Sequence, residues 1–173
     1  KINDLIESNK FTYFIYTKDN HPENHVSFKG SATSRLRILL DPLTEKYRGA
    51  FPVHCVKETF GSEIHKDLII KENAKIFNKG ENKQKEELSG FANPDLIIYL
   101  KESFVKKIFI VGLAFDFCVS STAYDSISNG YDTYVIKDCS KSISAEKEKT
   151  IEVDMISKGI NIIDSSMLKQ YLD

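Results

Sequence analysis

A cysteine in this 173-residue chain occupies a position suited to nucleophilic catalysis. Cys118 follows a continuous apolar run, Ile108 to Leu113, that predicts a buried strand, and it precedes a segment, 119–127, that predicts a helix. Unpaired N–H groups and the positive end of the helix dipole favour a thiolate at such a junction and can hold an oxyanion. The alternative is that Cys118 is a small buried core thiol, as most free cysteines are.

A second group of side chains has the types that bind metal ions. Asp19 and His21 lie two positions apart, so in an extended segment both side chains face the same way and can reach one ion. His25 follows four residues later and His54 lies in a separate loop. Carboxylate and imidazole ligands together suit zinc, iron or manganese. The spacing alone also allows these residues to be ordinary surface side chains.

A lysine follows another predicted strand. Lys79 ends the apolar segment that starts at Lys75. It is either a surface lysine whose stem covers apolar area or a desolvated ammonium that influences a nearby thiol. Beside Cys118 it would favour the thiolate and polarise a substrate.

Strands that alternate with helices must position these side chains. We expect strands at 11–16, 75–78, 108–113, 133–136 and 160–163, and helices at 2–6, 93–105, 119–127 and 145–157, the last capped by Ser144. This alternation predicts an α/β fold with three layers, a mostly parallel doubly wound sheet between helices, in a single domain over 1–173. Functional sites in such sheets lie at the carboxyl ends of the strands, so Asp19, Lys79 and Cys118 should converge. We expect Arg35 to Leu40 to pack and Asp41-Pro42 to form a turn.

Composition narrows the classes of partner and the compartment. There are 24 Lys and Arg against 25 Asp and Glu, a net charge of −1, which gives no electrostatic reason to expect nucleic acid or an anionic membrane surface. No apolar run approaches the roughly 20 residues that span a bilayer. The three cysteines, at 55, 118 and 139, have no disulfide-framework spacing, and we expect a cytoplasmic protein.

Four blocks of the sequence together resemble the nicotinamidase/pyrazinamidase family, within the isochorismatase-like cysteine hydrolases. Residues 17–28 resemble its metal-binding block, and 51–56 (Phe-Pro-Val-His-Cys-Val) its Trp-Pro-x-His-Cys block. Residues 78–80 with 89–91 resemble the catalytic-lysine block, and 112–119 (Gly-Leu-Ala-Phe-Asp-Phe-Cys-Val) the nucleophile block. The resemblance covers most of the chain, from Ile2 to about Ile163, and implies the isochorismatase-like fold.

The resemblance also implies roles for individual residues. Cys118 would be the nucleophile and Lys79 the catalytic lysine, with the backbone N–H groups of Ala114 and Cys118 as the oxyanion hole. A cis peptide would join Leu113 to Ala114. The expected metal ligands are Asp19, His21 and His54, with His25 at a position that is a further ligand in some relatives; the expected substrate-binding residues are Phe51 and Phe117.

The implied reaction is metal-dependent hydrolysis of nicotinamide to nicotinate and ammonia through a thioester, as part of NAD salvage. Zinc is the first expectation for the divalent ion, with iron and manganese as alternatives. The substrate would be a small molecule. The sequence leaves the oligomeric state open, and a homo-oligomer is compatible with it.

The sequence also departs from the family pattern. The family's catalytic aspartate lies on a first strand that would precede Ile2, so we expect that strand outside these residues or another segment in its place. Phe51 stands where the family usually has Trp, Phe115 replaces a usual Thr, and Leu88 lies near a position where an aromatic residue often lines the ring slot. These changes leave two alternatives: a related hydrolase acting on another small amide, or a non-catalytic family member that acts as a binding protein.

Overall fold

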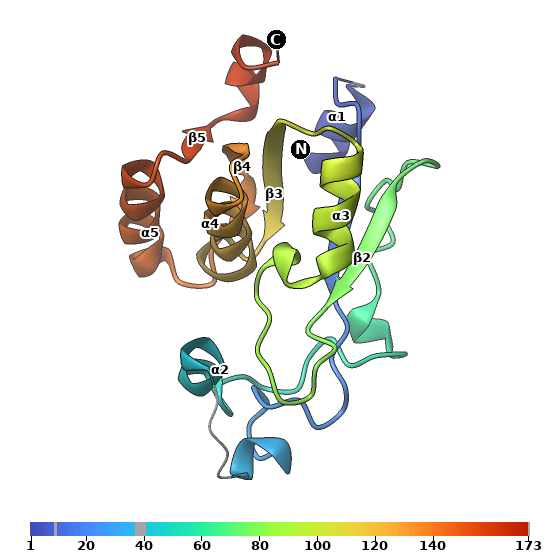
Figure 1. Cartoon of the computed structure of the whole chain (residues 1–173), viewed down its shortest axis with the longest axis vertical. Coiled ribbons are helices and arrows are strands. Elements are labelled where there is room, and N and C mark those ends of the chain that lie inside the picture. Colours follow the sequence, from blue (N-terminus) through green and yellow to red (C-terminus); the bar gives the residue numbers. More distant parts are fainter. Residues whose placement is uncertain (9, 37–40, 173) are drawn as a thin grey trace.

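A computed structural model describes residues 1–8, 10–36 and 41–172 (Figure 1). Its α-helices are α1 (Ile2–Glu7), α2 (Pro42–Tyr47), α3 (Pro94–Glu102), α4 (Ser120–Ser128) and α5 (Ala145–Ser157). Its strands are β1 (Ile15–Asp19), β2 (Lys75–Lys79), β3 (Lys107–Leu113), β4 (Asp132–Lys141) and β5 (Asn161–Ile163). Short 3-10 turns connect several of these elements, and a π-helical turn, Phe115–Val119, joins β3 to α4.

The strands form two parallel sheets. One has the order β3-β4-β5, with α4 and α5 as the crossover helices, and the other pairs β1 with β2. Among the described residues no strand pairs with both sheets, so no segment there takes the place of the family's first strand. The expectation that this strand lies outside these residues stays a prediction.

Alternating side chains of the strands face two helical layers, which confirms the three-layer α/β prediction. Ile110 and Val135 belong to one core with residues of α4 and α5. Their neighbours Phe109 and Ile136 point to the other face, into a core that includes Leu5 of α1. This period of two is what a strand between two helix layers produces. A third core packs α3 against β1, β2 and β3.

Three strand predictions need correction. The strand expected at 133–136 is β4, which runs over Asp132–Lys141. The first strand was expected at 11–16 but runs over Ile15–Asp19, because the polar residues at its end pair with β2 while the Phe11 ring packs edge-on against Phe109 of β3. The run from Ile108 to Leu113 was expected to be fully buried. Only Ile110 of β3 is buried and Leu113 is 75% exposed, because β3 pairs with β4 along one edge alone among the described strands.

Local capping explains where the other helices begin. Asp41-Pro42 starts α2 and does not form a simple turn: the Asp41 carboxylate accepts from the N–H groups of Leu43 and Thr44, and Pro42 occupies the first helical position. The predicted packing of Arg35 to Leu40 falls largely on residues 37–40, outside the described residues. No helix in the described part of the chain is both long and apolar enough to cross a membrane.

Candidate active site

Cys118 lies in the π-helical turn between β3 and α4. The peptide between Leu113 and Ala114 is cis, as the family resemblance implies. The backbone N–H of Ala114 favours the thiolate and so lowers the pKa of Cys118. An N–H close to the sulfur also lies near the place where a carbonyl oxygen would sit after attack.

Lys79 joins the two sheets at this point. Its ammonium lies 2.5 Å from Asp19 Oδ1 and 3.4 Å from Cys118 Sγ, and it also donates to the carbonyl of Glu87. Lys79 is only 5% exposed, and a buried ammonium requires such partners. Asp19, Lys79 and Cys118 therefore converge at the carboxyl ends of β1, β2 and β3, as the sequence predicts.

The charges of these groups act on one another. Burial by itself would lower the pKa of Lys79, but the neighbouring Cys118 and Asp19 outweigh it and hold that pKa above its ordinary value. Burial raises the pKa of the Cys118 thiol, and the Lys79 ammonium opposes this rise. Lys79 is thus charged at neutral pH and favours the thiolate when the proton leaves.

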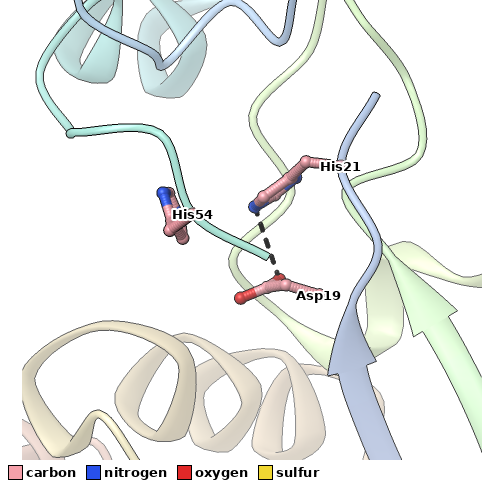
Figure 2. A group of neighbouring side chains, drawn as sticks. All are labelled: Asp19, His21 and His54. Atoms are coloured by element: carbon pink, nitrogen blue, oxygen red, sulfur yellow. Dashed lines mark ion pairs between the residues drawn. The ribbon is translucent and has the colours of Figure 1, made fainter. Parts of the chain in front are cut away.

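Asp19, His21 and His54 form a candidate metal centre (Figure 2). One ligand atom from each lies within 4.8 Å of those of the other two. His21 Nδ1 donates to the carbonyl of Gly80 at 2.9 Å, and His54 Nδ1 donates to the carbonyl of Pro52 at 2.8 Å. Because a carbonyl can only accept, each imidazole keeps its lone pair on Nε2, the state that a metal ligand needs. The residues therefore fit a divalent ion.

Burial and backbone geometry prepare His21 for this role. Burial lowers the pKa of His21, which keeps the ring neutral, and metal ligation requires the neutral form. The ring packs against Gly80, which has φ +68°. A Cβ added to Gly80 would lie 2.4 Å from the His21 ring, so only glycine fits there. The sequence analysis did not single out Gly80; its place directly after Lys79 was the available signal.

His25 lies beside the three candidate ligands but is engaged elsewhere. Its ring stacks on His21 with centroids 4.3 Å apart. Its Nδ1 bonds the hydroxyl of Ser27, and its Nε2 donates to the carbonyl of Lys85. With both ring nitrogens occupied, His25 supports the position of His21, and the geometry favours three protein ligands over four.

An aromatic wall adjoins the candidate metal centre. Phe51 lies edge-on to His54 at 5.8 Å and to Phe117 at 5.7 Å, so the structure brings together the two expected substrate-binding residues. Tyr47 of α2 stacks on Phe51 and also contacts Phe117. The sequence analysis missed Tyr47 because it did not predict α2.

Two departures from the family pattern are buried, and one of them, Phe115, lies away from this wall. Phe115 is fully buried and packs with Val119, Val135 and Met155 in the core under α4 and α5. Leu88 is 8% exposed. Replacement of Thr by Phe at position 115 is therefore a change in core packing, and it leaves the aromatic wall beside His54 unaltered.

Comparison with known proteins agrees with this geometry. The isochorismatase domain model matches residues 1–167. A nicotinamidase of Acinetobacter baylyi is 32% identical over 162 residues, which cover 90% of this chain and 76% of the relative. The crystal structure of a Pyrococcus horikoshii pyrazinamidase in complex with zinc is 33% identical, with a TM-score of 0.79, over 94% of this chain and 82% of that one.

A nicotinamidase/pyrazinamidase structure from Acinetobacter baumanii is 31% identical, with a TM-score of 0.82, over 96% of this chain and 83% of that one. Sequence, fold and the arrangement of the candidate site thus point to the same group of proteins. The chain belongs to the isochorismatase domain family, within its nicotinamidase/pyrazinamidase branch.

Proposed function

We propose that this protein is an amidohydrolase that converts nicotinamide to nicotinate and ammonia through a thioester on Cys118. The observation that carries the proposal is the contact of Lys79 with both Cys118 Sγ and Asp19, beside the candidate metal centre. Relatives that are nicotinamidases support the choice of substrate. The substrate is accordingly a small aromatic carboxamide.

The chain's own groups supply the nucleophile and the oxyanion donors for acylation. The Cys118 thiolate, favoured by Lys79, attacks the carboxamide carbon and forms a C–S bond. The backbone N–H groups of Ala114 and Cys118 stabilise the oxyanion that develops. The C–N bond then breaks, and the leaving nitrogen takes the proton that the thiol gave up and departs as ammonia.

Hydrolysis of the thioester completes the cycle. Water adds to the thioester carbon, the same N–H groups hold the second oxyanion, and the C–S bond breaks. Nicotinate is released and the Cys118 sulfur regains a proton. The family's aspartate on its first strand would carry these protons, and that assignment remains an expectation from the resemblance.

Asp19, His21 and His54 are the residues that would hold a divalent ion. The chemistry that a bound ion supplies is Lewis-acid anchoring of the pyridine nitrogen, which orients the ring. We propose zinc, because one carboxylate and two imidazoles with open positions are typical of zinc sites and a zinc complex is known for the Pyrococcus horikoshii relative. Phe51 and Phe117 would contact the faces or edges of the ring.

Ammonia release from nicotinamide by the zinc-loaded protein tests the proposal. Cys118→Ala should abolish turnover, with a loss of at least about 10⁴-fold in kcat, because Cys118 is the proposed nucleophile and the thiol beside Lys79. Cys139→Ala is the matched control: this cysteine lies in the core beside α1, and its removal should leave kcat within about twofold. A folded, zinc-loaded protein without turnover would contradict the proposal and favour a non-catalytic binding protein.

Substrate comparison separates nicotinamide hydrolysis from a related amidase activity. Benzamide has the same carboxamide and ring size but lacks the pyridine nitrogen. If the ring nitrogen is anchored as proposed, kcat/KM for benzamide should fall by at least about 100-fold relative to nicotinamide. Equal values would show that the pocket selects a different amide.

A further inference from the structure

Asp116 is a buried carboxylate with no part in the chemistry described so far. It lies in the π-helical turn between the two proposed oxyanion donors, Ala114 and Cys118, and is 8% exposed. Its Oδ1 accepts the N–H of Ile143 and its Oδ2 accepts the N–H of Ser144, both at 2.9 Å. Both oxygens are therefore committed to the backbone that leads into α5.

These bonds replace the cap that the sequence predicts for α5. Ser144 is at the N-cap position, but its side chain makes no capping hydrogen bond. The carboxylate of Asp116, 28 residues earlier, instead lies at this helix terminus, where negative charge is favoured. The two hydrogen bonds link the π-helical turn that contains Cys118 (the nucleophile turn) to the start of α5, because each carboxylate oxygen accepts from a separate N–H group.

The residue before Asp116 is also tied to α5. Lys137 of β4 lies with its ammonium 4.5 Å above the Phe115 ring centroid. The same ammonium pairs with Glu148 at 3.0 Å and with Glu152 at 2.5 Å, both on α5. Phe115 and Asp116 are thus anchored on the core side of the turn, immediately after Ala114.

We propose that Asp116 is a positioning residue that fixes the oxyanion hole for the proposed amide hydrolysis, on which this inference rests. The five-residue turn Phe115–Val119 contains Cys118 and directly follows Ala114, so the directions of both N–H groups depend on how the turn is held. Asp116 holds the middle of that turn against α5. Its loss therefore rotates the donors away from the oxygen that becomes charged, while Phe51 and the candidate metal ligands, which lie outside the turn, stay in place.

Asp116→Asn is the sharpest variant, because it keeps the shape of the side chain. Its amide offers one acceptor and turns an N–H₂ donor toward the second backbone N–H, so one of the two anchoring bonds is lost. We expect kcat for nicotinamide to fall about 10- to 100-fold, less than the loss of a whole oxyanion donor, with KM within about twofold.

Nicotinaldehyde provides a readout that does not depend on turnover. Its carbonyl carbon forms a C–S bond with Cys118, the thiol proton passes to the carbonyl oxygen, and no group leaves, so the thiohemiacetal can be followed by loss of the aldehyde absorbance. The tetrahedral oxygen needs the same donors as the reaction, whereas nicotinate forms no bond to Cys118 and no tetrahedral centre, so its affinity depends mainly on the ring pocket. In Asp116→Asn the aldehyde affinity should fall about 10- to 100-fold, with nicotinate affinity within about twofold.

Asp154→Asn is the matched control. Asp154 is a carboxylate of α5 that accepts from Tyr124 of α4 and pairs with Lys158, without contact to the nucleophile turn. This variant should keep kcat, aldehyde affinity and nicotinate affinity within about twofold of the original protein. If Asp116→Asn behaves in the same way, or weakens aldehyde and nicotinate equally, the positioning role is wrong.

Two further outcomes remain decisive. If Asp116→Asn does not fold, Asp116→Glu is the second variant, because it keeps both acceptor oxygens but moves them by one methylene. It should show the same selective loss of kcat and aldehyde affinity, at about 3- to 10-fold. Unchanged kcat and aldehyde affinity in Asp116→Glu would overturn the proposal. If the unmodified protein releases no ammonia from nicotinamide, the proposed function fails. The ratio of aldehyde to nicotinate affinity would still decide the role of Asp116.

Discussion

Regular secondary structure positions Cys118 and Asp19, whereas hydrogen bonds to loop carbonyls position the other two candidate metal ligands, His21 and His54. Cys118 follows β3, which lies in a three-stranded parallel sheet flanked by α4 and α5. His21 and His54 lie beyond the end of β1 and in the segment after α2, and each is oriented by one bond to a backbone carbonyl. A single isolated bridge pairs His21 with Val56.

The sheet of β3, β4 and β5 (the sheet half) should therefore determine folding stability, and the loops around β1 and β2 (the loop half) should determine the candidate site. The sheet of β3, β4 and β5 contributes two large apolar cores, so changes there should cost folding free energy. The loops around β1 and β2 bury fewer apolar groups, so changes there should remove the site while the protein stays folded. The following predictions test this separation, from the largest expected effect to the smallest.

Lys79→Met removes an ammonium that contacts both Asp19 of β1 and Cys118, which follows β3. We expect kcat for nicotinamide to fall about 10³-fold, because the charge that favours the Cys118 thiolate is lost. The Lys79 ammonium lowers the pKa of Cys118, so its removal raises that pKa further. Alkylation of Cys118 by iodoacetamide should be slower at neutral pH, and its inflection should move to higher pH.

Lys18→Met is the control for this variant. Lys18 neighbours Asp19 on β1, but its ammonium donates to the carbonyl of Ser62, away from Cys118. Its replacement should leave kcat within about twofold. An unchanged alkylation profile in Lys79→Met would mean that the ammonium does not act on the thiol.

Gly80→Ala should abolish the metal centre with a small effect on stability. The added Cβ would overlap the His21 ring, so we expect zinc affinity, measured by competition with a chelating dye, to fall at least about 100-fold. Gly130→Ala is a matched control, because Gly130 also has positive φ (+85°) and open space around it. Both variants should lose about 1–2 kcal/mol of unfolding free energy from the left-handed backbone, and unaltered zinc affinity in Gly80→Ala would contradict the assigned ligand geometry.

Met155→Ala tests the other half. Met155 of α5 is fully buried in the core with Phe115, Val119 and Val135. Its truncation leaves a cavity and should lower the free energy of unfolding by roughly 2–3 kcal/mol, measured by urea denaturation. Zinc affinity should stay within about twofold in the folded protein. A large loss of zinc affinity would show that the two halves are not separable.

The same contrast explains what the sequence could predict. Strands β2 and β3 and helices α3 and α5 were predicted to within a few residues, because their apolar periods and the Pro94 and Gly159 signals are local. The convergence of Asp19, Lys79 and Cys118 followed from the rule for parallel sheets. The gap between the sheets beside β3 was anticipated from the resemblance.

The missed features depend on contacts between distant segments. No local pattern indicates that the Gly80 carbonyl orients His21, or that Asp116 takes the capping role expected of Ser144. α2 was missed although Asp41 and Pro42 carry a helix-start signal, because the segment before it has no clean period. Tyr47 of the aromatic wall was missed with it.

Asp138→Asn probes an ion pair of β4 outside the candidate site and should have the smallest effect. Asp138 of β4 accepts from the Lys1 ammonium and from the N–H and hydroxyl of Ser165, each at 2.7 Å. Burial alone would raise the pKa of Asp138, but these bonds outweigh it and lower the pKa to about 2 from an ordinary value of 3.8. A carboxylate with a depressed pKa in the folded state stabilises the fold above its unfolded pKa, and this contribution disappears as the pH falls toward 2.

The asparagine variant should therefore lose about 1–2 kcal/mol of unfolding free energy at pH 7, a value reduced for the partial exposure of the pair. Urea denaturation at pH 7 and at pH 3 measures the difference between the two proteins. This difference should shrink at pH 3. At that pH the unfolded Asp138 carboxyl, with its ordinary pKa of 3.8, is largely protonated, whereas the folded one is still largely ionised, so protonation favours the unfolded state of the original protein. A constant difference at both pH values would mean that Asp138 acts through packing alone, and a change in kcat would mean that the Asp138 ion pair is coupled to the site.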